Sequence, residues 1–145
     1  MTRFAEERRV FYVEEPLIGT TDLPRVHIKE TREGVFVIVP HLSCHQSPPG
    51  RDRLVAALVQ EVIEEEDITN YTLWYDSPKF LTLTRDLHPL TVIYDCHEDR
   101  GSGTELGSIP SELEQELCEK ADLIFVGNEA SESWRSPDFD RIHAF

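Results

Sequence analysis

The feature that most constrains the fold of this chain is a set of short, almost uninterrupted apolar segments. Each has four to six residues, is rich in β-branched and aromatic side chains, and is followed by polar or turn-forming residues; the segments are residues 9–14, 35–40, 72–75, 91–95 and 122–126. Strands that are covered on both faces are nearly continuous in their apolar character, whereas half-exposed strands alternate. The pattern therefore predicts five buried strands that pair mainly in parallel.

Helical patterns separate the last four of these segments. Residues 51–66 carry apolar side chains along one stripe of a helix, residues 77–87 open on a Ser-Pro pair, and residues 110–121 open on a Ser-x-x-Glu capping box. This alternation predicts an α/β protein, specifically a Rossmann-like three-layer α/β/α fold in which right-handed crossovers connect a mostly parallel sheet of about five to six strands. We expect one domain, residues 1–145.

Two stretches depart from this rhythm. Residues 17–34 contain several turn-forming residues and are expected to form a loop or a β-ribbon, and residues 142–145 begin what reads as a sixth short strand. The first ten residues read as the last turns of a helix that leads into a strand. We therefore expect a domain that lacks its opening βα element and belongs to something larger.

Composition excludes several classes of function. The formal net charge of −14 argues against an unaided nucleic-acid-binding surface, because nucleic acids are polyanions. Three unevenly spaced cysteines, Cys44, Cys96 and Cys118, do not resemble a secreted disulfide scaffold, and Cys118 lies on the apolar stripe of its predicted helix. No apolar run is long enough to span a bilayer. We expect a cytoplasmic protein without a transmembrane segment, although peripheral proximity to a membrane is compatible with the sequence.

Five pieces of the sequence, in this order and at these spacings, carry a resemblance to a known family. They are RFAEERRVFYVEEP, GVFVIVPHL, LWYDSP, VIYDCHED and KADLIFVGNEA. With them the chain resembles, over residues 3–145, the N-terminal domain of a bacterial group 1 glycosyltransferase of the GT-B type, which has two Rossmann-like domains. The match lies in order and spacing more than in any one motif.

The resemblance implies the acceptor-side half of an enzyme that transfers a hexose from a nucleotide-sugar donor to a glycan or cell-envelope acceptor, without a cofactor. It also implies that the opening strand and the C-terminal donor-binding domain are absent, so that this half is inactive alone. Without that strand, residues 9–14 would pair with residues 72–75 or leave an open edge that favours a homodimer. Two alternatives are a non-catalytic interaction module with the same fold and a truncated gene product.

Candidate ligand-binding residues follow the predicted strands, because open α/β sheets bind ligands beyond the carboxyl ends of their strands. The substrate-binding candidates are Glu15, His41, Asp76, Ser77, His97, Glu98, Asp99, Asn128 and Glu129. Such side chains can hydrogen-bond the hydroxyl groups of a sugar acceptor, and a carboxylate or imidazole within reach can accept a proton. The structural alternatives are that Ser77 is a plain N-cap, that Asp95 caps the turn after its strand, and that the others are solvated. No catalytic residue is assigned.

A zinc site is the remaining alternative for the histidines and cysteines. The potential ligands His41, Cys44 and His45 follow one strand, and Cys96 and His97 follow another. Tetrahedral zinc takes such nitrogen and sulfur ligands. The His-x-x-Cys-His spacing is not a standard one, and the two strands would be separated in the sheet order that the resemblance implies, so we expect no metal.

Overall fold

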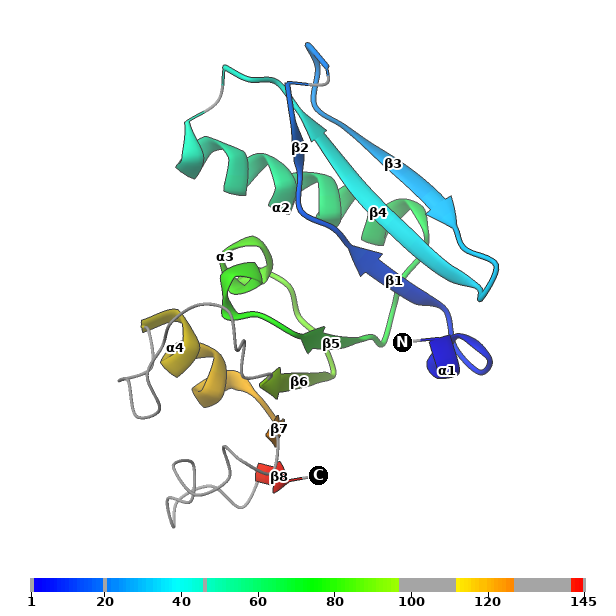
Figure 1. Ribbon diagram of the computed structural model, residues 1–145, viewed down its shortest axis with the longest axis vertical. Helices are drawn as coiled ribbons and strands as arrows, with labels where there is room; N and C mark the ends of the chain where they lie inside the picture. The colour runs from blue at the N-terminus through cyan, green and yellow to red at the C-terminus, as the bar shows by residue number, and fades with distance from the viewer. Residues whose placement is uncertain (1, 20, 46, 97–111, 127–141, 145) are drawn as a thin grey trace. The chain divides into compact units, whose positions relative to one another are not determined.

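The computed structural model describes residues 2–19, 21–45, 47–96, 112–126 and 142–144. The chain forms two compact units, Met1–Asp67 and Ile68–Phe145, and both contain helices and parallel strands (Figure 1). This confirms the mixed α/β class. The described strands form two four-stranded sheets, whereas the sequence predicted one sheet of five to six strands. None of the described helices is long and apolar enough to cross a membrane.

The first unit is built around one long central strand. Its elements are α1 (Thr2–Ala5), β1 (Val10–Val13), β2 (Leu17–Ile18), β3 (Arg25–Glu30), β4 (Val35–Leu42) and α2 (Pro48–Glu65). The short strands β1 and β2 pair in parallel with the first and second halves of β4, and β3 pairs with β4 in the antiparallel direction (Figure 1). The β3–β4 pair confirms the predicted β-ribbon, and its turn contains Gly34 with φ +78°, a conformation that glycine adopts without strain.

The core of the first unit lies between β4 and α2. On β4 the buried side chains of Ile38, Pro40 and Leu42 alternate with half-buried ones, so every second residue points to the same face. On α2 the buried residues recur at helical spacing; they are Val55, Leu58, Val59 and Val62. These belong to the apolar stripe that the sequence predicted for residues 51–66.

Arg9 connects the start of β1 with the end of α2. Its guanidinium group donates a 2.9 Å hydrogen bond to the backbone carbonyl of Glu66, lies 3.6 Å from the Glu66 carboxylate, and sits over the ring of Phe11, which stacks on Phe36. A cation near a helix C-terminus compensates both the helix dipole and the run of three glutamates there. The acidic end of α2 is thus partly neutralised by this arginine.

The second unit is a parallel sheet whose strands follow one another in chain order. It contains β5 (Thr72–Tyr75), β6 (Thr91–Cys96), β7 (Leu123–Val126) and β8 (Ile142–Ala144), together with the 3-10 turn η1 (Pro78–Phe80) and the helices α3 (Leu81–Thr84) and α4 (Glu112–Lys120). Strand β8 confirms the sixth strand that the sequence predicted. The helix predicted for residues 77–87 is shorter than expected. The hydroxyl groups of Thr82 and Thr84 donate hydrogen bonds to the backbone carbonyls of Lys79 and Phe80, and such bonds weaken helix propagation.

One face of this sheet and the helices η1, α3 and α4 enclose a single hydrophobic cluster. Its buried members are Tyr75, Leu81, Tyr94, Cys96, Leu117, Cys118, Ala121, Ile124 and Val126. Cys118 is therefore a core residue, as its place on the helical stripe predicted. An exposed ion pair links the end of α3 to α4: the Glu116 carboxylate lies 2.6 Å from the guanidinium group of Arg85, and 3.3 Å from the ammonium group of Lys120 on the same helix.

Replacing Leu117 with alanine tests the importance of this cluster. Leu117 is fully buried, so Leu117→Ala removes apolar contacts and leaves a cavity, and we expect a loss of about 2–5 kcal/mol in the free energy of unfolding. Leu90→Ala is the matched control, since the Leu90 side chain is 70% exposed and its truncation should change little. Urea unfolding measures both, and equal values for the two variants would contradict the assigned core.

Candidate functional site

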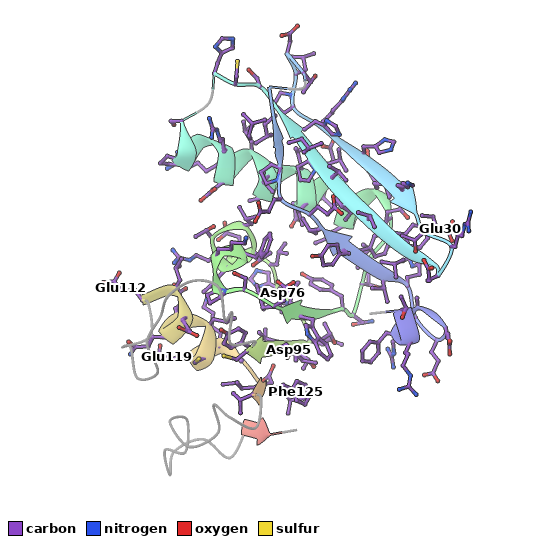
Figure 2. All side chains as sticks on the ribbon, viewed as in Figure 1. Glu30, Asp76, Asp95, Glu112, Glu119 and Phe125 are labelled. Atoms are coloured by element: carbon purple, nitrogen blue, oxygen red, sulfur yellow. The ribbon has the colours of Figure 1, made fainter. Side chains whose placement is uncertain are left out.

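The carboxyl edge of the second sheet brings two of the predicted polar positions together. Tyr75, the last residue of β5, pairs with Tyr94 of β6. Asp76 directly follows the end of β5, and Asp95 is the next residue of the neighbouring strand β6. Neighbouring strands lie about 4.8 Å apart. Figure 2 labels both carboxylates. Tyr75 and Tyr94 point into the core, so Asp95, the next residue of β6, belongs to the opposite face.

That face also carries an aromatic pair that sequence reasoning missed. Trp74 lies two residues before Asp76, and Phe125 pairs directly with Asp95. The rings of Trp74 and Phe125 stack with centroids 5.7 Å apart and an interplanar angle of 18°. The available signal was the two-residue period of a strand, which places Trp74 on one face and Leu73 and Tyr75 on the other.

The two aspartates differ in their surroundings. Asp76 is exposed in the turn after β5, whereas Asp95 is half-buried, with its Oδ1 atom shielded from solvent. Strand β6 extends to Cys96, one residue beyond the predicted end, so Asp95 is a strand residue and not the first residue of the following turn. Asp76 is the carboxylate that a dissolved ligand reaches most easily.

On the helix side of β6, opposite Asp95, several polar side chains are part of the core. The hydroxyl group of Tyr94 donates a 3.0 Å hydrogen bond to Glu114 of α4, and Cys96 and Cys118 are buried nearby in the same cluster. Burial raises the pKa of Tyr94 above its usual value, and burial with the nearby Glu114 carboxylate raises the pKa of Cys118 to about 12. A thiol that stays protonated is a poor nucleophile, so these groups are structural.

Ser77 occupies the N-cap position of η1, but its side chain does not form the capping hydrogen bond. It has extended backbone angles (φ −150°, ψ 137°) at the N-cap position, and its hydroxyl group forms no capping hydrogen bond. Five further candidates lie outside the described residues; they are His97, Glu98, Asp99, Asn128 and Glu129.

The candidates of the first unit, Glu15 and His41, lie in the segment after β1 and near the end of β4. Strand β1 ends beside the middle of β4, where the backbone N–H of Glu14 donates to the carbonyl of Ile38 at 3.0 Å. The chain then continues along β4 as β2, so that Leu17 pairs with His41. Glu15 thus lies in the chain between Glu14, which bonds Ile38, and Leu17, which pairs with His41 near the carboxyl end of β4. The imidazole of His41 packs edge-on against that of His27.

Two other kinds of site receive no support in the part of the chain that is described. No group of three or more histidine, cysteine, aspartate or glutamate residues there is placed to hold a metal ion. A cavity of about 50 Å³ lies between α3, α4 and the sheet, where Leu73, Leu81, Val92 and Lys120 contribute to its lining. It has room for a few water molecules and not for a sugar.

No family model, curated protein or solved structure matches this chain. The chemistry of the described edge is therefore argued from its own residues. The carboxylates Asp76 and Asp95 accept hydrogen bonds, and the neighbouring indole ring of Trp74 offers a flat apolar surface. Hydroxyl groups on a ring with an apolar face, as in a sugar, suit this combination.

Cysteine reactivity tests the assignment of the buried cluster. Cys44 is exposed, whereas Cys96 and Cys118 are buried, so in the native protein at pH 8 we expect Ellman's reagent to modify Cys44 quickly and the other two only after unfolding. Mass spectrometry of the labelled chain locates each modification. Rapid labelling of Cys118 in the native protein would contradict its placement.

Alkaline unfolding tests the raised pKa of Cys118. The folded-state value of about 12 lies above the usual value of 9.0, so this thiol stabilises the fold below pH 9, and its contribution declines as the pH rises from there toward 12. We expect the free energy of unfolding to fall between pH 9 and 11, and to fall less steeply in Cys118→Ala, by up to ~1.4 kcal/mol per pH unit. Cys44→Ala should retain the wild-type slope in urea titrations; equal slopes in all three proteins would refute the assignment.

Proposed function

We propose that this chain is the acceptor-side domain of a GT-B type glycosyltransferase, an enzyme that moves a sugar from a nucleotide-sugar donor to a glycan or cell-envelope acceptor. The observation that carries the proposal is that Asp95 lies on β6 and Asp76 directly follows β5, its parallel neighbour, with Trp74 two residues before Asp76. Carboxyl ends of parallel strands are the usual ligand positions of α/β sheets. The resemblance described above gives the class of reaction.

In this proposal the described edge binds the acceptor and not the donor. Asp76, which is exposed, accepts a hydrogen bond from an acceptor hydroxyl group, Asp95 orients a second hydroxyl, and Trp74 contacts the apolar face of the ring. The acceptor oxygen then forms the new bond to the anomeric carbon of the donor while the bond to the nucleoside diphosphate breaks. A carboxylate within hydrogen-bond reach can take the proton of the attacking hydroxyl group.

The charge of the chain supports this division of roles. Residues 68–145 contain 15 acidic and six basic residues, so the potential around the second unit disfavours a diphosphate. Basic groups that neutralise the departing diphosphate would come from a separate donor-binding domain. The isolated chain is accordingly proposed to bind sugars and to be inactive as a transferase.

Amide chemical shifts test the acceptor edge directly. Titration of the isotopically labelled chain with a panel of neutral oligosaccharides should shift the amide signals of Trp74, Asp76 and Asp95, because these residues surround the proposed site. Asp76→Asn should weaken that binding on the order of tenfold, since a charged acceptor is lost. Asp86→Asn is the matched control: Asp86 is also exposed, and it lies in the turn after α3 and not directly after a strand of the sheet.

The same titration with UDP-glucose and GDP-mannose separates the two halves of the proposal. We expect no shifts with either nucleotide-sugar. Tight binding of a nucleotide-sugar would overturn the acceptor-side assignment, and no response to any saccharide would count against a sugar site. In-frame coding sequence for a second α/β domain in the neighbouring DNA would support the enzyme over a non-catalytic interaction module.

A further inference from the structure

The last residue of β5 is joined to α3 by two consecutive hydrogen bonds. The hydroxyl oxygens of Tyr75 and Thr84 lie 2.6 Å apart, and the Thr84 hydroxyl group donates a 3.0 Å hydrogen bond to the backbone carbonyl of Phe80. A threonine hydroxyl group has a single proton, and in Thr84 that proton is directed to Phe80. Tyr75 is therefore the donor of the 2.6 Å bond. We call this chain of two bonds, from Tyr75 through Thr84 to the Phe80 carbonyl, the hydroxyl relay.

The hydroxyl relay closes residues 75–84 into a ring. The backbone leaves β5 at Tyr75, passes through Asp76 and Ser77 into η1, and reaches α3, where the Thr84 hydroxyl group meets the Tyr75 side chain (Figure 1). Asp76, which Figure 2 labels, is the first residue after Tyr75 within this ring. Closing a loop removes conformations from the residues inside it. The conformation of Asp76 therefore depends on a hydrogen bond made at the far end of the ring.

Both ends of the ring are fixed in the second unit. The Tyr75 side chain is 5% exposed, and Leu81 at the start of α3 is 2% exposed. Arg85, which directly follows α3, lies 2.6 Å from Glu116 of α4, so the end of α3 is also linked to the neighbouring helix. Burial raises the pKa of Tyr75, so its hydroxyl group keeps the proton that it donates. A bond between two fixed ends constrains the chain that connects them.

Local bonds within the ring leave Asp76 to the hydroxyl relay. Pro78 has a restricted φ angle, the backbone N–H of Phe80 donates to the carbonyl of Ser77 at 3.4 Å, and the Thr82 hydroxyl group donates to the carbonyl of Lys79 at 3.0 Å. These bonds order η1 and α3, but none of them includes Asp76. This aspartate is exposed in the turn between β5 and η1, where the closure of the ring is the constraint that acts on it.

We propose that Tyr75 and Thr84 are positioning residues of the acceptor site, because the hydroxyl relay holds Asp76 in the conformation that binds an acceptor hydroxyl group. This inference rests on the proposed function, in which Asp76 is the exposed carboxylate that the acceptor reaches. A group that is ordered before binding loses less conformational entropy when the ligand arrives, so the affinity is higher. Neither hydroxyl group contacts the acceptor in this arrangement, and both act through the backbone of the ring.

The structural alternative is a hydroxyl relay that stabilises the core and does nothing for Asp76. Losing it would then lower the free energy of unfolding and leave the folded protein unchanged at Asp76. A positioning role predicts a further effect in the fully folded protein, namely greater mobility of the Asp76 backbone and weaker saccharide binding. The NMR order parameter of the Asp76 amide reports that mobility directly.

Thr84→Val tests the positioning role, since valine has the shape of threonine without the hydroxyl group. In the isotopically labelled whole chain we expect a lower order parameter for the Asp76 amide and about fivefold weaker binding of the neutral oligosaccharides. Thr84→Ser retains a hydroxyl group and should restore both values. Thr82→Val is the matched control: it removes a hydroxyl group from the same helix, one that donates to Lys79 and not to β5, and Asp76 should behave as in the wild type.

Tyr75→Phe removes the donor of the hydroxyl relay and provides a second, independent variant. It should also lower the Asp76 order parameter and the saccharide affinity. Because the two hydroxyl groups act as one unit, Tyr75→Phe/Thr84→Val should lose no more than Thr84→Val alone. Additive losses in the double variant would contradict a shared relay.

The positioning role and the proposed function fail in different ways. An unchanged Asp76 order parameter in Thr84→Val and Tyr75→Phe, at a temperature where circular dichroism shows both to be folded, would overturn the positioning role. Lower order at Asp76 with undiminished saccharide affinity would overturn it as well. If no saccharide binds the wild type and the order parameter still falls in both variants, the hydroxyl relay orders Asp76 as inferred, and the acceptor-side function is what is wrong.

Discussion

The parallel register between β5 and β6 is the constraint on which the second unit depends. Pairing of Tyr75 with Tyr94 sends both rings into the core beneath η1, α3 and α4. The alternation of β6 sends Asp95 to the opposite face, and the end of β5 at Tyr75 places Asp76 in the turn that follows. A slip by one residue would exchange the two faces of one strand, exposing a tyrosine and burying a carboxylate, which costs far more than it gains. The core therefore fixes where the carboxylates stand.

Strand β4 is the strand on which the packing of the first unit depends, and its two faces differ in burial. Ile38, Pro40 and Leu42 are buried on the side that also carries α2, and Val37, Val39 and His41 alternate with them on the other side. A strand that is apolar on both faces is typical of α/β sheets with layers on both sides. Within the described part of the first unit, helix α2 supplies the layer that packs on the Ile38, Pro40 and Leu42 side of β4.

The sequence predicts which segments are strands better than it predicts how they pair. The segment 72–75 coincides with β5, and the ribbon before β4 and the short strand near residue 142 were also foreseen. A continuous apolar run identifies a buried strand but contains no signal for its neighbours, so two sheets were read as one. The same continuity hides which side chains share a face, and for that reason Trp74 and Phe125 were missed while the polar residues beside them were found. Residues 97–99, 128 and 129 lie outside the described residues, so their role as ligand-binding candidates stays a prediction from the sequence.

The environment of Tyr94 connects the stability of the second unit with the behaviour of its carboxyl edge. The Tyr94 hydroxyl group donates a hydrogen bond to Glu114 of α4 on the helix side of β6. The position of Asp95, the next residue of β6, therefore depends on the packing of α4 against this strand. Burial raises the pKa of Tyr94, and the thiol of Cys118 is held at a pKa of about 12, so neither group ionises near neutral pH. Tyr94 and Cys118 therefore keep their protonation state near neutral pH, and the helix-side packing behind Asp95 does not change through them.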